Sequence, residues 1–214
     1  MLALILCITP TTSYLESLLK RFFDIFFALF LLVFVMLWLV PLLWLLNFFV
    51  VGGPLFFSHQ REGKERKLFW CYKFRTFPKL AVHPKPGESL STPIPRLWTL
   101  LRSSGIDELP QVLNIIRGEM SVIGPRPHLP EYNDYYQKVV GKKNMDKRHS
   151  VRPGLTGLAQ VRGYRGDTPN KSSIQNRINS DIEYISKQSI VLDLEIILIS
   201  FFMLVRAFIR RIFN

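Results

Sequence analysis

The sequence predicts an α+β fold that is mostly helical, with a re-entrant membrane helix-break-helix, a small β-hairpin and amphipathic interfacial helices. Three observations predict it. The chain of 214 residues is 48% hydrophobic, with 17 Phe, yet it carries a formal net charge of +12. One long apolar run spans residues 22–51. The basic segment after it has short helical and strand patterns that do not alternate as βαβ units. The aromatic content excludes a mainly disordered chain, and a single long apolar run excludes a polytopic membrane protein.

The apolar run follows an N-terminal segment at residues 1–21. As one straight helix it would be roughly 45 Å long, against a hydrocarbon core of about 30 Å. Pro41 removes a backbone donor and divides the run. Basic residues flank both ends, whereas the positive-inside bias places such residues on one face of the membrane. They are Lys20 and Arg21 before the run, and Arg61, Lys64, Arg66, Lys67, Lys73 and Arg75 after it. We therefore expect a helix that enters the membrane, bends at Pro41 and returns to the same face; the alternative is a tilted single-pass anchor.

The central segment, residues 52–189, is expected to begin with a β-hairpin. Residues 55–60 and 68–74 are rich in aromatic and apolar side chains, and the polar residues 61–67 separate them. A proline-rich loop is expected at residues 78–95. Helices are expected at residues 96–102, 107–117, 131–147 and 174–188. No glycine-rich nucleotide loop follows a strand. The chain has only two cysteines, far apart and without a motif spacing, which excludes a disulfide scaffold and a cysteine-based zinc site.

A second membrane contact is expected at the C-terminus, residues 190–214. Residues 196–205 are nearly all apolar but too few to span a bilayer. Arg206, Arg210 and Arg211 follow them, which is typical of a helix lying in the interface of an anionic leaflet. The alternative is an ordinary buried helix. The apolar start, residues 1–8, has no basic region or cleavage site, so we do not expect a signal peptide.

Two adjacent carboxylates are the strongest candidates for chemistry. Asp107 and Glu108 come directly before Leu109-Pro110-Gln111, and proline is favoured in the first turn of a helix. The helix dipole there stabilises the ionised form of a carboxylate, which could act as a nucleophile or hold a divalent cation. The alternative is a pair of capping acids.

Several basic side chains lie in turns suited to anions. Gly124-Pro125-Arg126-Pro127 holds Arg126 in a rigid turn. A guanidinium held in this way can bind a phosphate through two parallel hydrogen bonds. Lys73 and Arg75 are two residues apart, so they share one face of a strand. Further basic turns contain Arg148, His149 and Arg152, and then Arg162 and Arg165 with Asp167. Each alone could be a solvated or headgroup-facing charge. Together with the carboxylates and the membrane segment, they indicate transfer of a phosphorylated group to a lipid, with a metal offsetting diphosphate charge.

With these residues in this order, the chain resembles the bacterial sugar transferase family, the monotopic phosphoglycosyl transferases. The motifs that carry the resemblance are KRFFDIFFAL (20–29), YKFRTF (72–77), IDELPQVLNIIRGEMSVIGPRP (106–127), RHSVRPGLTGLAQVRGYRGDT (148–168) and DIEYI (181–185). The family uses a re-entrant helix with a proline break, often Ser-Pro, where this chain has Val40-Pro41. The resemblance makes residues 52–189 the catalytic domain, on the cytoplasmic face of the bacterial inner membrane.

The resemblance implies transfer of a sugar 1-phosphate from a UDP-sugar to undecaprenyl phosphate, with release of UMP, as the first membrane step of surface glycan synthesis. It implies Asp107 as the nucleophile that forms an aspartyl-phosphosugar intermediate. Glu108 assists with Mg²⁺ or proton handling, and Asp107 and Glu108 together are the expected metal ligands. The residues expected to bind substrate or phosphate are Lys73, Arg75, Gln111, Arg126, Arg148, Arg152 and Arg162. The arm at residues 165–168 is similar to that of exopolysaccharide members, which favours UDP-glucose or UDP-galactose.

Other functions remain as alternatives. One is a catalytically silent, membrane-bound scaffold in a glycan assembly complex, and the intact Asp107 and Glu108 argue against it. A nucleic-acid partner is not expected, because the aromatic residues gather in membrane-like runs and do not alternate with basic ones as in a stacking platform. The expected partners are therefore the UDP-sugar, undecaprenyl phosphate and the bilayer, with a homodimer left open.

Overall fold

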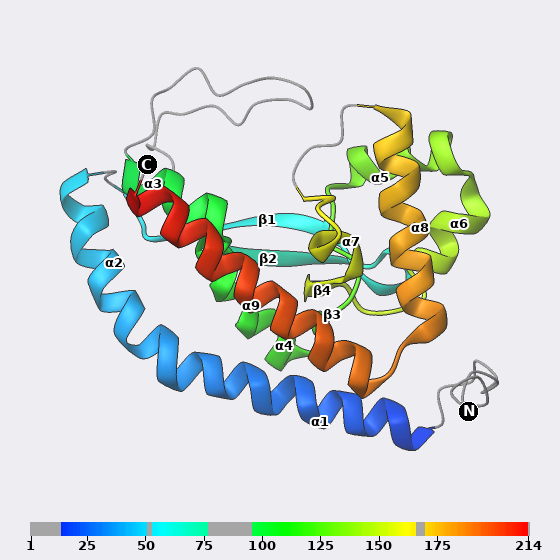
Figure 1. Cartoon of the computed structure of the whole chain (residues 1–214), viewed down its shortest axis with the longest axis horizontal. Coiled ribbons are helices and arrows are strands. Elements are labelled where there is room, and N and C mark those ends of the chain that lie inside the picture. The colour runs from blue at the N-terminus through cyan, green and yellow to red at the C-terminus, as the bar shows by residue number, and fades with distance from the viewer. Residues whose placement is uncertain (1–13, 51–52, 77–95, 166–169, 214) are drawn as a thin grey trace.

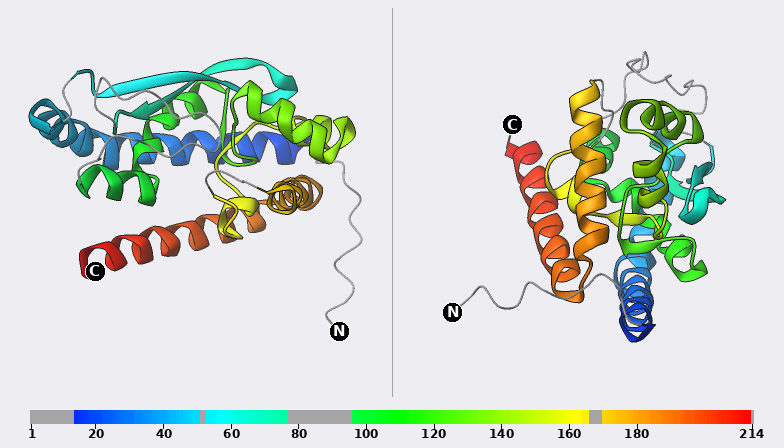
Figure 2. Two further views of the ribbon diagram at one scale, coloured as in Figure 1. Left: turned by 90° about the horizontal axis from the view of Figure 1, so that it is seen from above. Right: turned by 90° about the vertical axis from the view of Figure 1, so that its right-hand side faces the viewer.

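The computed structural model describes residues 14–50, 53–76, 96–165 and 170–213. Its described part is mostly helical and contains two small two-stranded sheets, in agreement with the expected α+β class (Figures 1 and 2). The expectations for residues 1–13, for the loop at 78–95 and for the arm at 166–168 lie outside the described residues.

The N-terminal apolar run forms one bent helical rod. It consists of α1 (Tyr14–Leu31), a π-helical turn, η1 (Leu32–Met36), and α2 (Leu37–Val50). The expected break at Pro41 is wrong: Pro41 lies inside α2, and the chain stays helical on both sides of it. Proline leaves one backbone carbonyl of the preceding turn without its donor, and a π turn widens a helix locally. The rod therefore bends without dividing into two legs, and α2 turns away from the direction of α1 (Figure 1).

The polar residues of this apolar rod face the rest of the protein. Asp24 is 1% exposed and accepts hydrogen bonds of 2.9 Å from the Ser121 hydroxyl and the Val122 amide. Asn47 is also buried and donates to the Gly53 carbonyl at 3.0 Å. The opposite side is apolar and exposed, with Trp38 at 76% and Phe49 at 75%. The segment Leu15–Phe49 is long and apolar enough to cross a membrane.

The expected β-hairpin is confirmed. Strand β1 (Phe56–Glu62) pairs antiparallel with β2 (Leu68–Phe74), and the register runs from Phe56 opposite Phe74 to Glu62 opposite Leu68. A 3₁₀ turn, η2 (Lys64–Arg66), joins the strands, and it has two residues of positive φ, Glu65 and Arg66. Phe69, Cys71 and Phe74 point from β2 into the core. Lys73 lies on the same face of β2 as Phe69 and Cys71, and its ammonium reaches Glu108 in the segment that carries the paired carboxylates.

A second, parallel pair of strands was not expected from the sequence. Strand β3 (Ser121–Ile123) pairs with β4 (Gly154–Thr156), and each has three residues, too few for a pattern to reveal. The backbones approach so closely that a Cβ on Gly154 would lie 2.1 Å from the Gly124 nitrogen. Gly154 must therefore remain glycine for the turn at Gly124 to keep its place.

The remaining helices follow the expected pattern with three differences, of which one is a short helix at Leu158–Val161 that was not expected. The expected helix at 107–117 begins as a 3₁₀ turn and becomes α-helical only at Val112. The expected helix at 131–147 divides at Gly141, whose φ is +82°. The elements are α3 (Arg96–Ser104), η3 (Ile106–Gln111), α4 (Val112–Arg117), α5 (Pro130–Val140), α6 (Lys142–Arg148), α7 (Leu158–Val161), α8 (Lys171–Lys187) and α9 (Ile190–Phe213).

Helix α9 is half buried and half exposed. It packs on α3, α7 and the β3–β4 pair, and Asp193 and Ile196 are each 1% exposed. Its other side presents bulky apolar side chains, among them Val191 at 77%, Phe201 at 58% and Phe202 at 61%. An ordinary buried helix would not leave these side chains exposed, so the exposed face favours the interfacial interpretation.

Candidate active site

Glu108 lies at the centre of a cluster built by three separate segments. It is in η3, and its carboxylate accepts a hydrogen bond of 2.5 Å from the Lys73 ammonium of β2. Arg126, in the loop after β3, grips both oxygens of the same carboxylate, with Nη1 to Oε2 at 2.6 Å. A bidentate guanidinium and an ammonium on one buried carboxylate form a charge-assisted network with fixed geometry.

Asp107, the neighbour of Glu108, has no such direct partner among the hydrogen bonds of the described residues. It is 9% exposed. Burial, and then the negative charge of Glu108, raise the pKa of Asp107 to about 7, although the charges of Lys73, Arg126 and Arg102 oppose this shift. Burial and the like charge of Glu108 thus oppose the stabilisation of ionised Asp107 that was expected from the helix dipole.

Glu108 behaves in the opposite way. Burial alone would raise its pKa, but the positive charges of Arg126 and Lys73 hold the pKa of Glu108 well below its usual range. The adjacent carboxyls thus have different protonation behaviour. Two neighbouring acids with pKa values shifted in opposite directions are typical of catalytic sites. One group then stays ionised, while the other gains or loses a proton near neutral pH.

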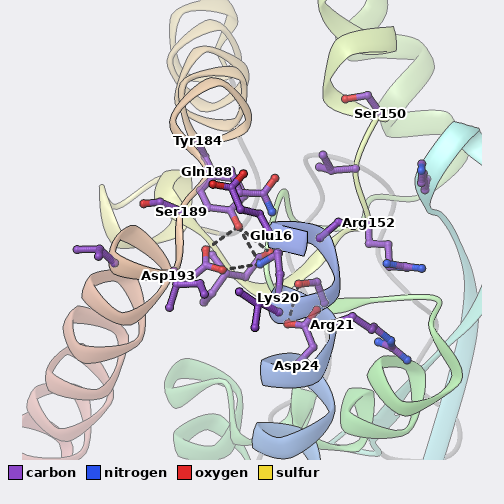
Figure 3. Close-up of a pocket in the computed structure, with 18 residues that line it drawn as sticks. Glu16, Lys20, Arg21, Asp24, Ser150, Arg152, Tyr184, Gln188, Ser189 and Asp193 are labelled. Atoms are coloured by element: carbon purple, nitrogen blue, oxygen red, sulfur yellow. Dashed lines mark hydrogen bonds and ion pairs between the residues drawn. The ribbon is translucent and has the colours of Figure 1, made fainter. Parts of the chain in front are cut away.

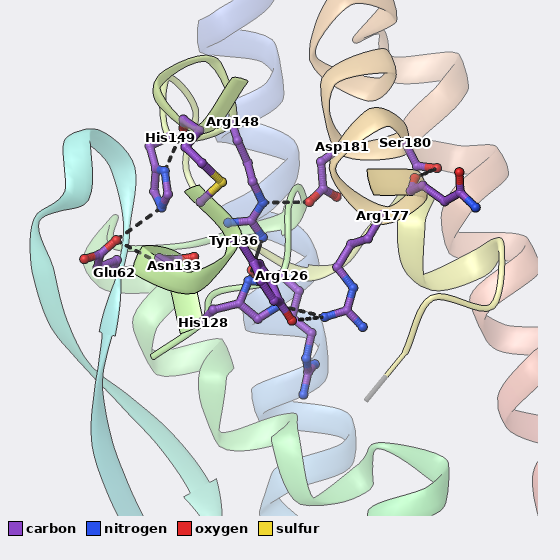
Figure 4. A network of polar contacts seen from close by, with 12 residues as sticks. Glu62, Arg126, His128, Asn133, Tyr136, Arg148, His149, Arg177, Ser180 and Asp181 are labelled. Atoms are coloured by element: carbon purple, nitrogen blue, oxygen red, sulfur yellow. Dashed lines mark hydrogen bonds and ion pairs between the residues drawn. The ribbon is translucent and has the colours of Figure 1, made fainter. Parts of the chain in front are cut away.

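The loop that carries Arg126 rests on a buried polar network (Figure 4). Arg148 donates a 2.6 Å hydrogen bond to the Arg126 carbonyl, and its Nε pairs with Asp181 of α8 at 2.8 Å. His128 contacts Arg148 through Nδ1 at 3.0 Å and Arg177 through Nε2 at 3.1 Å. Burial, followed by the charges of Arg148 and Arg177, holds the pKa of His128 well below its usual range, so the imidazole is neutral. The network fixes the backbone from which Arg126 reaches Glu108.

Of the site residues predicted from the sequence, four lie together in the structure: Lys73, Asp107, Glu108 and Arg126. Gln111, which is 2% exposed, follows them in η3. Arg148 is only 3% exposed and engages the protein, so its contacts favour a role in positioning Arg126. Its direct contact with substrate stays a prediction.

The three other predicted arginines have protein partners outside this cluster. Arg75 donates to the Pro54 carbonyl at 3.0 Å and lies over the Phe57 ring. Arg152 donates to the Gly118 carbonyl at 2.8 Å, and Arg162 pairs with Glu183 of α8 at 2.6 Å.

Sequence reasoning missed the contribution of Arg61 to this site. Arg61 Nη1 donates to the Pro127 carbonyl at 3.1 Å, and its guanidinium interacts electrostatically with Arg126 and Glu108. The sequence placed it only among the basic flanks of the membrane segment. Arg165, noted there in a glycine-containing loop, also interacts electrostatically with Arg126 and Glu108. No local signal distinguishes these two arginines from other surface charges, because a tertiary contact brings them together.

A magnesium ion at this site would have few protein ligands. Among the described residues, no group of three or more His, Cys, Asp or Glu side chains could hold a metal. Mg²⁺ is usually bound by one or two carboxylates together with substrate phosphates and water. Asp107 fits that limited role, because its carboxyl forms no hydrogen bond with Arg126 or Lys73. Both oxygens of Glu108 are already held by those two cations, so Glu108 as a metal ligand stays a prediction.

Comparison with known proteins identifies the family of the chain. The family described as bacterial sugar transferase matches residues 15–207. The Xanthomonas campestris pv. campestris protein named UDP-glucose:undecaprenyl-phosphate glucose-1-phosphate transferase is 40% identical over 154 residues, which cover 69% of this chain and 31% of the relative. The Escherichia coli (strain K12) protein of that name is 35% identical, over 70% of this chain and 32% of its own length. The chain thus spans about a third of these two relatives. The Rhizobium leguminosarum bv. phaseoli exopolysaccharide production protein PSS is 38% identical over 86% of this chain and 93% of the relative. The chain belongs to the bacterial sugar transferase family.

Proposed function

We propose that the protein transfers a sugar 1-phosphate from a UDP-sugar to undecaprenyl phosphate and releases UMP. The names of the relatives favour UDP-glucose as the donor and exopolysaccharide synthesis as the process. The observation that carries the proposal is the pair of adjacent carboxyls: Asp107, with a pKa near neutrality, lies beside a Glu108 that Lys73 and Arg126 hold ionised.

The proposed reaction has two displacements at one phosphorus atom. An Asp107 carboxylate oxygen attacks the phosphorus that bears the sugar, and the bond to the bridging oxygen breaks, so that UMP leaves with that oxygen. A phosphate oxygen of undecaprenyl phosphate then attacks the same phosphorus and displaces the Asp107 carboxylate. In this proposal Lys73 and Arg126 stabilise the negative charge of the diphosphate and of both transition states.

Mg²⁺ is part of this proposal as a cofactor. Asp107 and Glu108 would hold it together with diphosphate oxygens, and it would neutralise part of the diphosphate charge. The protein's own residues supply the nucleophile and the fixed cations. Because Arg126 keeps Glu108 ionised, the site retains a charged carboxylate even where Asp107 is protonated.

The proposal places the active site at the cytoplasmic face of the bacterial inner membrane. The exposed apolar sides of the α1–η1–α2 rod and of α9 would enter the lipid. The basic residues at both ends of the rod favour a re-entrant path over a single crossing. A bent rod suits this path, because an apolar segment that does not cross must turn within one leaflet.

The test is UMP release by the purified full chain with UDP-glucose and UDP-galactose, undecaprenyl phosphate and Mg²⁺. The wild-type protein should release UMP, and Asp107→Asn should lower the rate on the order of 10³-fold or more. Without undecaprenyl phosphate, a UDP-sugar labelled on the phosphorus that bears the sugar should leave label on the wild-type protein but none on Asp107→Asn. Absence of UMP with every sugar would favour the scaffold, and near-normal turnover by Asp107→Asn would refute the nucleophile assignment.

A further inference from the structure

A cavity lined by both apolar and charged side chains lies apart from the paired carboxylates. Its volume is about 510 Å³, within the range of small-molecule sites. It opens between the start of α1, the loop before β4 and the junction of α8 and α9 (Figure 3). None of Lys73, Asp107, Glu108 and Arg126 lines it.

One wall of the cavity is a cluster of polar side chains that hydrogen-bond to one another. Lys20 of α1 pairs with Asp193 of α9 at 2.6 Å, and the Tyr184 hydroxyl of α8 donates to the other Asp193 oxygen at 2.7 Å. Asp24, deeper in the same wall, is engaged by the Ser121 hydroxyl and the Val122 amide. Asp193 and Asp24 therefore already have hydrogen-bond donors from the protein.

Two arginines of the cavity lining have only carbonyl partners among their hydrogen bonds in the described residues. Arg21 donates to the carbonyls of Ile115 and Ile116 at 2.8 and 3.1 Å, and Arg152 donates through Nε to that of Gly118 at 2.8 Å. These carbonyls end α4, where the helix dipole attracts cations.

The two guanidinium groups are close enough for their like charges to interact. In Figure 3 both point to the same side, away from Lys20 and Asp193. Neither forms a salt bridge with a carboxylate of the described chain, and Arg152 is exposed. An anion held between them would relieve the repulsion and occupy the remaining N–H donors of Arg152.

Apolar surfaces adjoin this cationic site on two helices. Leu15, Leu18 and Phe22 are exposed on α1, at 64%, 48% and 72%, and Val191 and Leu194 are exposed at the start of α9. Leu19, Ile190 and Val191 line the cavity itself. A ligand that matches both features has a phosphate group attached to apolar chains.

We infer that this cavity binds the headgroup of an anionic glycerophospholipid, with its phosphate between Arg21 and Arg152 and its acyl chains along the exposed sides of α1 and α9. The inference rests on the membrane association in the proposed function. The bound lipid is a structural ligand distinct from the acceptor, since no residue of the paired-carboxylate cluster reaches this cavity. It would join the N-terminal rod to the α8–α9 junction at the membrane surface.

The experiment measures binding of phosphatidylglycerol and phosphatidylcholine to the full chain in neutral detergent by native mass spectrometry, with the thermal midpoint as a second readout. Phosphatidylglycerol should bind more tightly and raise the midpoint. Arg152→Gln should weaken this binding about tenfold, as expected for loss of one charge-assisted contact. Because Arg152 is exposed, this variant should fold. Lys143→Gln is the charge-matched control, since it removes one exposed positive charge on α6, away from the cavity lining.

Three outcomes would overturn the inference. Equal binding of the two lipids would exclude recognition of an anionic headgroup. Equal losses in Arg152→Gln and Lys143→Gln would show attraction to net charge without a site. Competition by glycerol phosphate at the same concentration as the lipid would identify a site for soluble phosphates. Failure of the proposed function would be seen separately, as missing UMP release by a protein that still binds phosphatidylglycerol.

Discussion

At the scale of single residues, the two carboxyls of the candidate site differ because their partners differ. Glu108 contacts Lys73 and Arg126 directly, whereas Asp107 is buried beside the negative charge of Glu108. The sequence shows two adjacent acids and cannot distinguish them. The side chains that create the difference come from β2 and from the loop after β3, distant in the chain and close in the fold.

The first prediction concerns pH. Only the ionised Asp107 can attack phosphorus, and its pKa is raised to about 7, so the nucleophilic form is lost as the pH falls below that value. The burst of UMP without undecaprenyl phosphate should therefore rise from about pH 5.5 to about pH 8 and then level off. Measuring this half-reaction avoids the titration of the acceptor phosphate. A flat profile across that range would contradict the assignment.

The second prediction concerns the stability of Asp107→Asn. Because the folded pKa is raised above the value of 3.8 for an unperturbed Asp, ionisation of Asp107 destabilises the folded state. This cost grows between about pH 4 and pH 7 and is then constant, at up to about 4 kcal/mol. Asp107→Asn should thus raise the thermal midpoint more at pH 8 than at pH 5. The exposed Asp146→Asn is the control and should show no such difference.

At the scale of elements, helix α8 supports the site although it contributes no residue to the paired-carboxylate cluster. Asp181 of α8 orients Arg148, and Arg148 holds the carbonyl of Arg126. The sequence indicated α8 by its helical period but assigned no role to Asp181. Its partner Arg148 was expected to bind substrate, and its contacts place it beneath the loop.

The third prediction follows from this chain of contacts. Asp181→Asn retains the size of the side chain but removes the charge that holds Arg148, so the Arg126 loop should lose its fixed position. We expect a fall of about tenfold or more in kcat, with a smaller change in KM, as when positioning for the transition state is lost. The control Glu183→Gln on the same helix removes an exposed pair with Arg162 and should reduce kcat much less. A change in thermal stability alone, with normal kcat, would limit Asp181 to a structural role.

At the scale of the whole molecule, the positive charge and the apolar surface have separate places. The apolar residues are exposed on the α1–η1–α2 rod and on α9, while buried and half-buried arginines gather near the paired carboxylates. In the proposed function, a site so arranged would receive a charged nucleotide sugar from water and a lipid phosphate from the membrane surface. The bend of the rod determines how both ends relate to that surface.

The fourth prediction tests the path of the rod in the membrane. In a Cys7→Ser background, Ser17→Cys lies before most of the rod and Ser58→Cys after it; the remaining Cys71 is buried. A re-entrant rod leaves both positions on the cytoplasmic side. An impermeant maleimide added to spheroplasts should therefore label neither until the cells are lysed. Labelling of Ser17→Cys in intact spheroplasts would establish the single-pass alternative.

The sequence by itself determined the features that depend on neighbouring residues. The apolar run, the β-hairpin, the end of α4 at Gly118, the α8 helix and the Asp107-Glu108 pair all follow from local pattern, because backbone preference and periodicity act within a few residues. Only the tertiary structure decided that the rod continues through Pro41, that β3 and β4 pair, and that Arg148 supports Arg126. It also decided that Asp107 titrates near neutrality, contrary to the local helix-dipole argument. The physical reason is that burial and charge pairing depend on groups far apart in the chain, and these forces exceed the local preferences at the site.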